Sequence, residues 1–182
     1  WYYRLTNDVF RGSIGLSMVA YIYLDALTGT RTVFAEASTS GSIRINFGTN
    51  GNKLRYNTRT ANVGYLTYTG TEILTVGWNE IGVTQAFSGS GAEGVTLYTN
   101  GVSEFFATGG VTGIETSFTG MPTSIGTWNY NTSGAHAQNF NGNISFVRIS
   151  NTDVWDSTQV AEALTTPAKG IGAISAPMTF AM

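Results

Sequence analysis

The sequence predicts an all-β protein built as a two-sheet antiparallel sandwich, with one short helix near the C-terminus. Apolar and polar residues alternate with a period of two along most of the 182 residues. Turn signals return about every ten residues, which is the rhythm of a sandwich. A chain of this length buries a core without disulfide bonds, and it contains no cysteine. We therefore expect one domain over residues 1–166, followed by an apolar tail over residues 167–182.

The composition excludes several classes of protein. Only 11% of the residues are charged, against about 25% in an ordinary soluble domain, and hydroxyl and amide side chains take their place. Disorder and long-helix proteins require much more charge than this. The nine basic residues are scattered among eleven acidic ones, so nucleic acid is not an expected partner. No apolar run approaches the roughly 20 residues of a membrane span, so membrane insertion is not expected.

The first long strand runs from Ser13 to Leu24, and its alternation separates a core face from a second face that is small or aromatic. Ile14 and every second residue after it form the predicted core face. The same reading predicts further strands at Arg31–Ala37, Ser42–Phe47, Lys53–Tyr56, Gly64–Tyr68, Glu72–Gly77, Glu80–Phe87, Val95–Tyr98, Val102–Phe106, Thr123–Trp128 and Phe140–Ser150.

Two Asn-Gly pairs predict tight hairpins, because both residue types tolerate positive φ. Asn50–Gly51 lies within the turn 48–52, and Asn100–Gly101 separates two alternating runs. Each pair should therefore join neighbouring antiparallel strands.

One short helix is expected after Trp155. Asp156 is a good N-cap, and Gln159 stands at the third helical position, where it completes a capping box. Pro167 ends the helix, because the residue before proline is pushed out of helical conformation. The tail that follows carries one charge, Lys169, and we expect it to pack on its own sheet or on a neighbouring subunit.

Four motifs follow one another in the second half, with the predicted helix behind them: Leu74–Thr84 with its tryptophan, the Leu97–Gly101 hairpin, Ser124–Gly126 and Phe140–Asn151. In this order they resemble the laminin-G-like branch of the concanavalin A-like lectin/glucanase superfamily. The resemblance covers most of residues 10–166. It implies a jelly-roll topology and a buried Trp78, and it leaves the function open, because the fold hosts lectins, pentraxin-like binders, glycosidases and lyases.

Enzyme activity is not expected. Glucanases of this superfamily place carboxylates at alternating strand positions, and the retaining mechanism requires two of them about 5 Å apart. The nearest acidic pair here is Asp153 and Asp156, at a turn and a helix cap. The single histidine, His136, lies in a loop without a nucleophile motif.

Calcium is the one metal that the resemblance suggests, because family members often bind it through Asp, Asn and loop carbonyl groups. Asp25 and Asp153 are the candidate ligands at the rim of the sandwich. The alternative is that both serve local turns, where Asp is favoured for its hydrogen bonding.

The clearest candidate binding site is the loop that follows the Ile125–Gly126 strand. It combines aromatic rings, which stack on sugar rings, with amides, which bond to sugar hydroxyl groups. The alternative reading makes Trp128 the last core residue of its strand and the remainder a polar loop. The candidate ligand-binding residues are Trp128, Asn129, Tyr130, Asn131, His136 and Asn139.

Two functions remain open from the sequence. The first is a non-catalytic recognition module that binds a glycan or another cell-surface ligand at an extracellular or virion surface. The second is a structural or decoration subunit of a viral capsid, tail or extracellular assembly, whose function is self-association. The charge-poor composition and the aromatic segment Trp1–Tyr3 favour a homo-oligomer in the second case.

Overall fold

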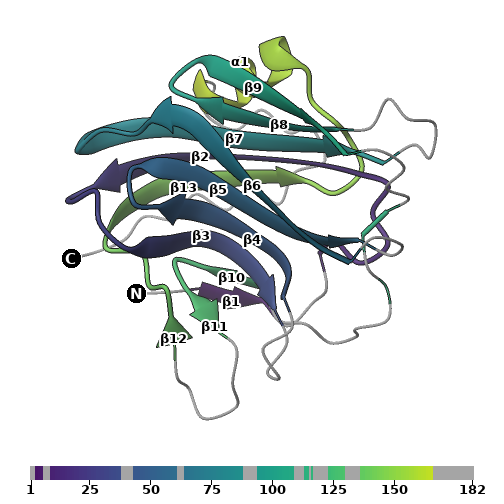
Figure 1. The fold of residues 1–182 in the computed structure, drawn as a ribbon, viewed down its shortest axis with the longest axis horizontal. Helices are drawn as coiled ribbons and strands as arrows, with labels where there is room; N and C mark the ends of the chain where they lie inside the picture. Colours follow the sequence, from purple (N-terminus) through teal and green to yellow (C-terminus); the bar gives the residue numbers. More distant parts are fainter. Residues whose placement is uncertain are drawn as a thin grey trace.

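Two antiparallel sheets stack face to face in the computed structural model (Figure 1). The structure describes residues 3–5, 9–37, 43–60, 64–87, 94–108, 113–114, 116, 123–129 and 136–165. The six-stranded sheet has the order β1 (Tyr3–Leu5), β10 (Thr123–Ile125), β3 (Thr30–Ala37), β4 (Ile43–Asn50), β5 (Lys53–Thr60) and β6 (Gly64–Ile73). The five-stranded sheet has the order β13 (Gly142–Ser150), β2 (Gly15–Leu24), β7 (Gly77–Ala86), β8 (Gly94–Thr99) and β9 (Val102–Ala107).

Two smaller elements complete the fold. The two-stranded hairpin of β11 (Trp128–Asn129) and β12 (His136–Ala137) lies beside the six-stranded sheet. The helix α1 (Ser157–Thr165) lies at the opposite side of the molecule, against the five-stranded sheet (Figure 1). The predicted tail, residues 167–182, is outside the described residues.

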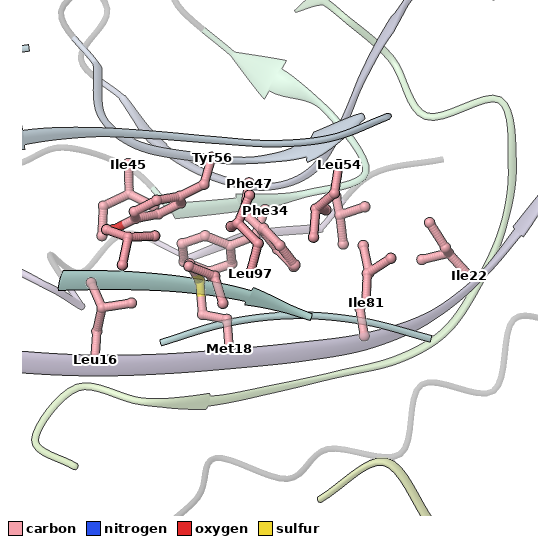
Figure 2. Close-up of a cluster of buried hydrophobic side chains, with 14 of the residues drawn as sticks. Leu16, Met18, Ile22, Phe34, Ile45, Phe47, Leu54, Tyr56, Ile81 and Leu97 are labelled. Atoms are coloured by element: carbon pink, nitrogen blue, oxygen red, sulfur yellow. The ribbon is translucent and has the colours of Figure 1, made fainter. Parts of the chain in front are cut away.

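One apolar layer between the sheets forms the core. Figure 2 shows Phe34, Ile45, Phe47, Leu54 and Tyr56 of the six-stranded sheet pointing toward side chains of the other sheet. The facing side chains include Leu16, Met18, Ile22, Ile81 and Leu97, and all ten are buried. The predicted sandwich and the core face of β2 are therefore confirmed from Leu16 onward.

A hydrogen bond crosses this apolar layer. The hydroxyl group of Tyr56 donates to Oε1 of Gln85 over 2.7 Å, and both side chains are fully buried. Burial raises the pKa of Tyr56, so the phenol stays neutral and retains its proton for this bond. The bond therefore links β5 of one sheet to β7 of the other.

Both predicted hairpins form, but only Asn100–Gly101 provides the two central residues of its turn as predicted. Asn100 has φ 49° and Gly101 has φ 83°, and Thr99 pairs with Val102 across this two-residue turn. In the other hairpin Asn50 pairs with Lys53, so its turn residues are Gly51 and Asn52. Asn50 is thus the last residue of β4.

Several predicted details are wrong, each for a local reason. Ile14 precedes β2 and is 71% exposed, although its parity predicted the core face. A bulge in β3 between Thr32 and Phe34 puts both Val33 and Phe34 in the core. The strand predicted at Glu72–Gly77 does not form: β6 runs from Gly64 to Ile73, residues 74–76 connect the two sheets, and β7 begins at Gly77.

The helix begins as predicted. The carboxylate of Asp156 accepts from the backbone N–H of Gln159 over 2.8 Å, and the Gln159 side chain accepts from the Asp156 N–H over 2.9 Å. Val160 is buried against Val19 and Tyr98 on the outer face of the five-stranded sheet, with Trp155 half-buried beside them. Because the helix has only nine residues, its stability depends on this contact.

A buried ion pair ties the segment before β2 to the six-stranded sheet. Glu36 and Arg44 form a salt bridge in which both side chains are fully buried. The second carboxylate oxygen of Glu36 accepts from the backbone N–H groups of Val9 and Phe10, over 2.9 and 3.0 Å. Burial raises the pKa of Glu36, and the positive charge of Arg44 is the strongest of the influences that lower it.

Replacing Glu36 with alanine should destabilise the protein by about 3–5 kcal/mol, because Arg44 would remain charged in the interior. Urea denaturation followed by circular dichroism measures this loss. The double variant Glu36→Leu, Arg44→Met should be more stable than Glu36→Ala, since it removes both charges. Equal stability of the two variants would contradict this role for the ion pair.

The variant Tyr56→Phe should lose about 1–3 kcal/mol of unfolding free energy, because Gln85 Oε1 would be left buried without its donor. Thermal denaturation compared with the unchanged chain measures the effect. Tyr68→Phe is the matched control, because Tyr68 is half-buried and stacks on Tyr56. A loss as large in the control would contradict the assignment to the hydrogen bond.

Candidate functional site

The loop predicted to bind a ligand is built on the β11–β12 hairpin. Gly126, with φ 81°, ends β10 and turns the chain, so the strand predicted to reach Trp128 divides in two. Trp128 then pairs with Ala137, and Asn129 pairs with His136. The hairpin therefore brings three predicted site residues, Trp128, Asn129 and His136, onto adjacent backbone positions.

A fourth predicted residue, Asn139, closes the base of this hairpin. Its side-chain oxygen accepts a hydrogen bond from the Thr127 hydroxyl over 2.8 Å, and the residue is exposed. Trp128 is half-buried. Tyr130 and Asn131 lie outside the described residues.

Gln138 joins the hairpin to the six-stranded sheet. It has φ 55°, and its backbone carbonyl accepts from the N–H of Thr32 over 2.9 Å. Its side-chain oxygen Oε1 lies 3.1 Å from Nη2 of Arg55 and 3.4 Å from the hydroxyl of Thr32. One residue in a left-handed conformation thus receives donors from two strands.

A row of buried amides continues from Thr32 across the sheet. Nδ2 of Asn46 donates to the Thr32 hydroxyl over 2.9 Å, and Nδ2 of Asn57 donates to Oδ1 of Asn46 over 3.5 Å. Asn46 and Asn57 alternate with the core residues Phe47 and Tyr56, so they face away from the core. They are only 1% and 2% exposed, and they form a fixed polar layer beneath the surface.

Arg55 reaches Gln138 because the strand between them carries no side chain at that position. Thr32, Gly48 and Arg55 are in register across β3, β4 and β5. A Cβ atom at Gly48 would collide with the backbone carbonyl of Arg31. The close approach of β3 therefore requires glycine here, and the register leaves no β4 side chain between Arg55 and Gln138.

Tyr65 adds a phenol at the outer strand of the same face. It pairs with Arg59 and is 44% exposed, and the Arg59 guanidinium lies 5.9 Å from its ring centroid. Burial raises the pKa of Tyr65, and the nearby Arg55 and Arg59 only partly offset this, so the hydroxyl remains a donor at neutral pH. We use the name polar face for Thr32, Asn46, Arg55, Asn57, Tyr65 and Gln138.

The sequence contains a signal for the polar face that is separate from the predicted binding loop. The polar positions of β4 and β5 alternate with core residues, and they carry amides and guanidinium groups. Such residues on a sheet face are well suited to hydrogen bonding with hydroxyl groups. Gln138 gives no comparable signal, because its contribution depends on a backbone conformation that one residue type does not specify.

The two candidate calcium ligands have other contacts in the structure. Asp25 lies 3.7 Å from the guanidinium of Arg31. Asp153 accepts from the Ser150 hydroxyl over 3.3 Å within a local turn, and its backbone carbonyl accepts from Ser17. Within the described ranges, no group of three His, Cys, Asp or Glu residues gathers to hold a metal ion. A calcium role for either residue stays a prediction.

Comparison with solved structures shows the same fold in several proteins. A heptameric SAP-like pentraxin from Limulus polyphemus superposes with a TM-score of 0.65 at 14% identity, over 90% of this chain and 75% of the pentraxin. The CBM40 module of the Ruminococcus gnavus IT-sialidase, bound to α2,3-sialyllactose, gives 0.65 at 11% identity over 82% of both chains. Domains LG4–5 of the mouse laminin α1 chain give 0.58 at 14% identity, over 87% of this chain and 40% of that one.

The search of curated protein sequences found no match. A laminin G family model, described as "Concanavalin A-like lectin/glucanases superfamily", matches residues 2–161. The motif resemblance is thereby confirmed over nearly the whole described chain. The protein belongs to the concanavalin A-like lectin/glucanase superfamily.

Proposed function

We propose that the protein is a non-catalytic carbohydrate-binding module, whose ligand lies across the polar face and the β11–β12 hairpin. The observation that carries this proposal is the connected network from Asn57 through Asn46 and Thr32 to Gln138 and Arg55. Thr32, Asn46 and Asn57 are themselves buried, so the network acts by holding the half-buried Arg55 and Gln138 in fixed positions before a ligand arrives. Fixed groups lower the entropic cost of binding a flexible, hydroxyl-rich molecule.

The chemistry of the exposed groups suits a sugar. Thr67 and Thr69 are exposed beside Asn57 and Arg55, and Tyr65 offers a half-exposed ring. Arg55 and Arg59 give this face positive charge, so an acidic sugar is the expected ligand, with its carboxylate paired to a guanidinium. The sialyllactose complex of the related CBM40 module supports this choice of ligand class. An extracellular location is part of the proposal.

The proposed module is non-catalytic because the residues of the polar face include no carboxylic acid. The described hydrogen bonds of the network involve no carboxylate group. Glu36, the acid of the adjacent strand β3, is fully buried in its pair with Arg44. The mechanism of most glycosidases needs two accessible carboxyl groups on either side of the bond that is broken.

Arg55→Ala should weaken binding of a sialylated oligosaccharide by about tenfold or more, because a charged hydrogen bond contributes about 1.5–3 kcal/mol. Glycan-array screening identifies the ligand, and titration calorimetry measures its affinity. Gln138→Ala should weaken binding as well, since it removes the acceptor that orients Arg55. Ser103→Ala, at an exposed position of β9 in the other sheet, is the control and should bind normally.

Trp128→Ala tests the hairpin separately from the sheet. Loss of binding in this variant would support a ligand that spans both parts, and loss only in Arg55→Ala would confine the ligand to the polar face. Binding that is unchanged in the Arg55, Gln138 and Trp128 variants would contradict the proposed site. Absence of glycan binding by the folded protein would contradict the proposed function.

Self-association is a second candidate function, and the edge strand β9 favours it. Val102 and Phe105 of this strand are 46% and 62% exposed, and β9 is the last strand of its sheet among the described residues, an edge that can pair with another copy. A subunit of a virion or extracellular assembly would use such an edge. Light scattering after size exclusion tests this: Phe105→Lys should convert oligomers to monomers, and a wild-type monomer at high concentration would contradict this function.

A further inference from the structure

The outer face of the five-stranded sheet carries a row of aromatic side chains next to the end of α1. Tyr21 stacks on Trp78 with ring centroids 4.6 Å apart, and Trp78 also contacts Tyr23 at 5.5 Å. The ring centroid of Phe146, on β13, lies 6.2 Å from that of Tyr21, on the side of β2 away from Trp78. We call Phe146, Tyr21, Trp78 and Tyr23 the aromatic row, which crosses the adjacent strands β13, β2 and β7.

The aromatic row is incompletely covered in the described part of the chain. The resemblance implied that Trp78 is buried, but it is 46% exposed, so that expectation was wrong. Trp78 pairs with Tyr23 on the face opposite to Ile22 and Ile81, which explains its position outside the core. An exposed indole that stacks on one tyrosine and meets a second one edge-on is unusual for a surface without a partner.

The helix directs the chain toward this row. At its beginning, the backbone N–H of Trp155 donates to the Ser17 hydroxyl over 2.8 Å. Near its end, the carbonyl of Ala163 accepts from Arg148, and Leu164 packs in the same cluster as Phe146. The chain therefore leaves α1 at Thr165 beside the first member of the aromatic row.

The residues that follow have the length and composition to cover the row. Seventeen residues of the sequence, 166–182, come after α1, and Lys169 is their single charged residue. Three adjacent strands span about 10 Å, and an extended chain covers about 3.3 Å per residue. Four extended residues therefore suffice to cross the row, and apolar residues such as Ile171 and Ile174 follow immediately.

Charge complementarity favours the same occupant. Glu80 is half-buried and pairs with Tyr21, next to Trp78 on the outer face of β7. Among the described strand residues of this outer face, it is the one carboxylate. Lys169, four residues beyond the helix, lies within reach of it. We propose that residues 166–182 dock on the aromatic row of their own sheet, with Lys169 paired to Glu80.

Paramagnetic NMR on the full chain tests this proposal. The chain contains no cysteine, so Ser175→Cys accepts a single nitroxide label within the tail. The indole N–H signal of Trp78, assigned by its absence in Trp78→Phe, should be lost through broadening. The indole signal of Trp128, on the hairpin at the other side of the molecule (Figure 1), is the internal control and should remain.

A mixed sample separates the protein's own tail from that of another copy. Isotope-labelled chain without nitroxide is mixed with unlabelled chain that carries it. The proposal predicts full Trp78 intensity in this mixture. Loss of the signal here would overturn the proposal in favour of a second copy, and retention of the signal in both samples would overturn it outright.

The proposed ion pair between Lys169 and Glu80 is tested separately in the nitroxide-labelled chain. Lys169→Glu should restore at least half of the Trp78 signal, because it places two carboxylates together. Adding Glu80→Lys should broaden the signal again. Persistent broadening in Lys169→Glu would overturn the assignment of Glu80 as the partner. These outcomes are independent of glycan binding.

Discussion

The single apolar layer between the two sheets is the constraint on which the rest of the structure depends. Each strand contributes every second side chain to this layer, and its other side chains must find a different environment. The six-stranded sheet fills its outer face with amides, hydroxyls and guanidinium groups. The five-stranded sheet fills its outer face with aromatic rings and the apolar side of α1. The two outer faces therefore differ in chemistry although they share one core.

Fixed polar groups distinguish the polar face from an ordinary hydrophilic surface. An exposed amide in water exchanges partners freely, whereas Asn46 and Asn57 are buried and bonded to each other. Arg55 reaches over Gly48 to an acceptor that belongs to the hairpin, and Thr32 bonds both the backbone and the side chain of Gln138. Movement of the hairpin would thus alter the sheet surface, so the two parts of the proposed site act as one.

Local patterns predicted most of the fold, because alternation and turn chemistry depend on near neighbours in the sequence. The helix cap at Asp156 and the Asn100–Gly101 turn were predicted for this reason. The resemblance to the family predicted the wrong environment for Trp78. This residue lies three positions before the core residue Ile81 on β7, so the alternation of the strand puts it on the opposite face. The bulge that places Val33 beside Phe34 has no sequence signature. The site was predicted only at the hairpin, because Gln138 and Arg55 meet through strand register across 83 residues of sequence.

A bulge in β13 decides which of its residues can meet the rest of the molecule. The pairing with β2 shifts between Ile144 and Phe146, so Ser145 stands as the extra residue. Before the shift Ile144 faces the core, and after it Val147 and Ile149 do, while Phe146 and Arg148 face outward. If the strand continued in regular alternation through Ser145, the two sets would be exchanged, with a guanidinium turned inward and two aliphatic side chains outward. The bulge therefore absorbs one residue of the sequence and leaves Val147, Ile149 and Arg148 each on the face that suits its side chain.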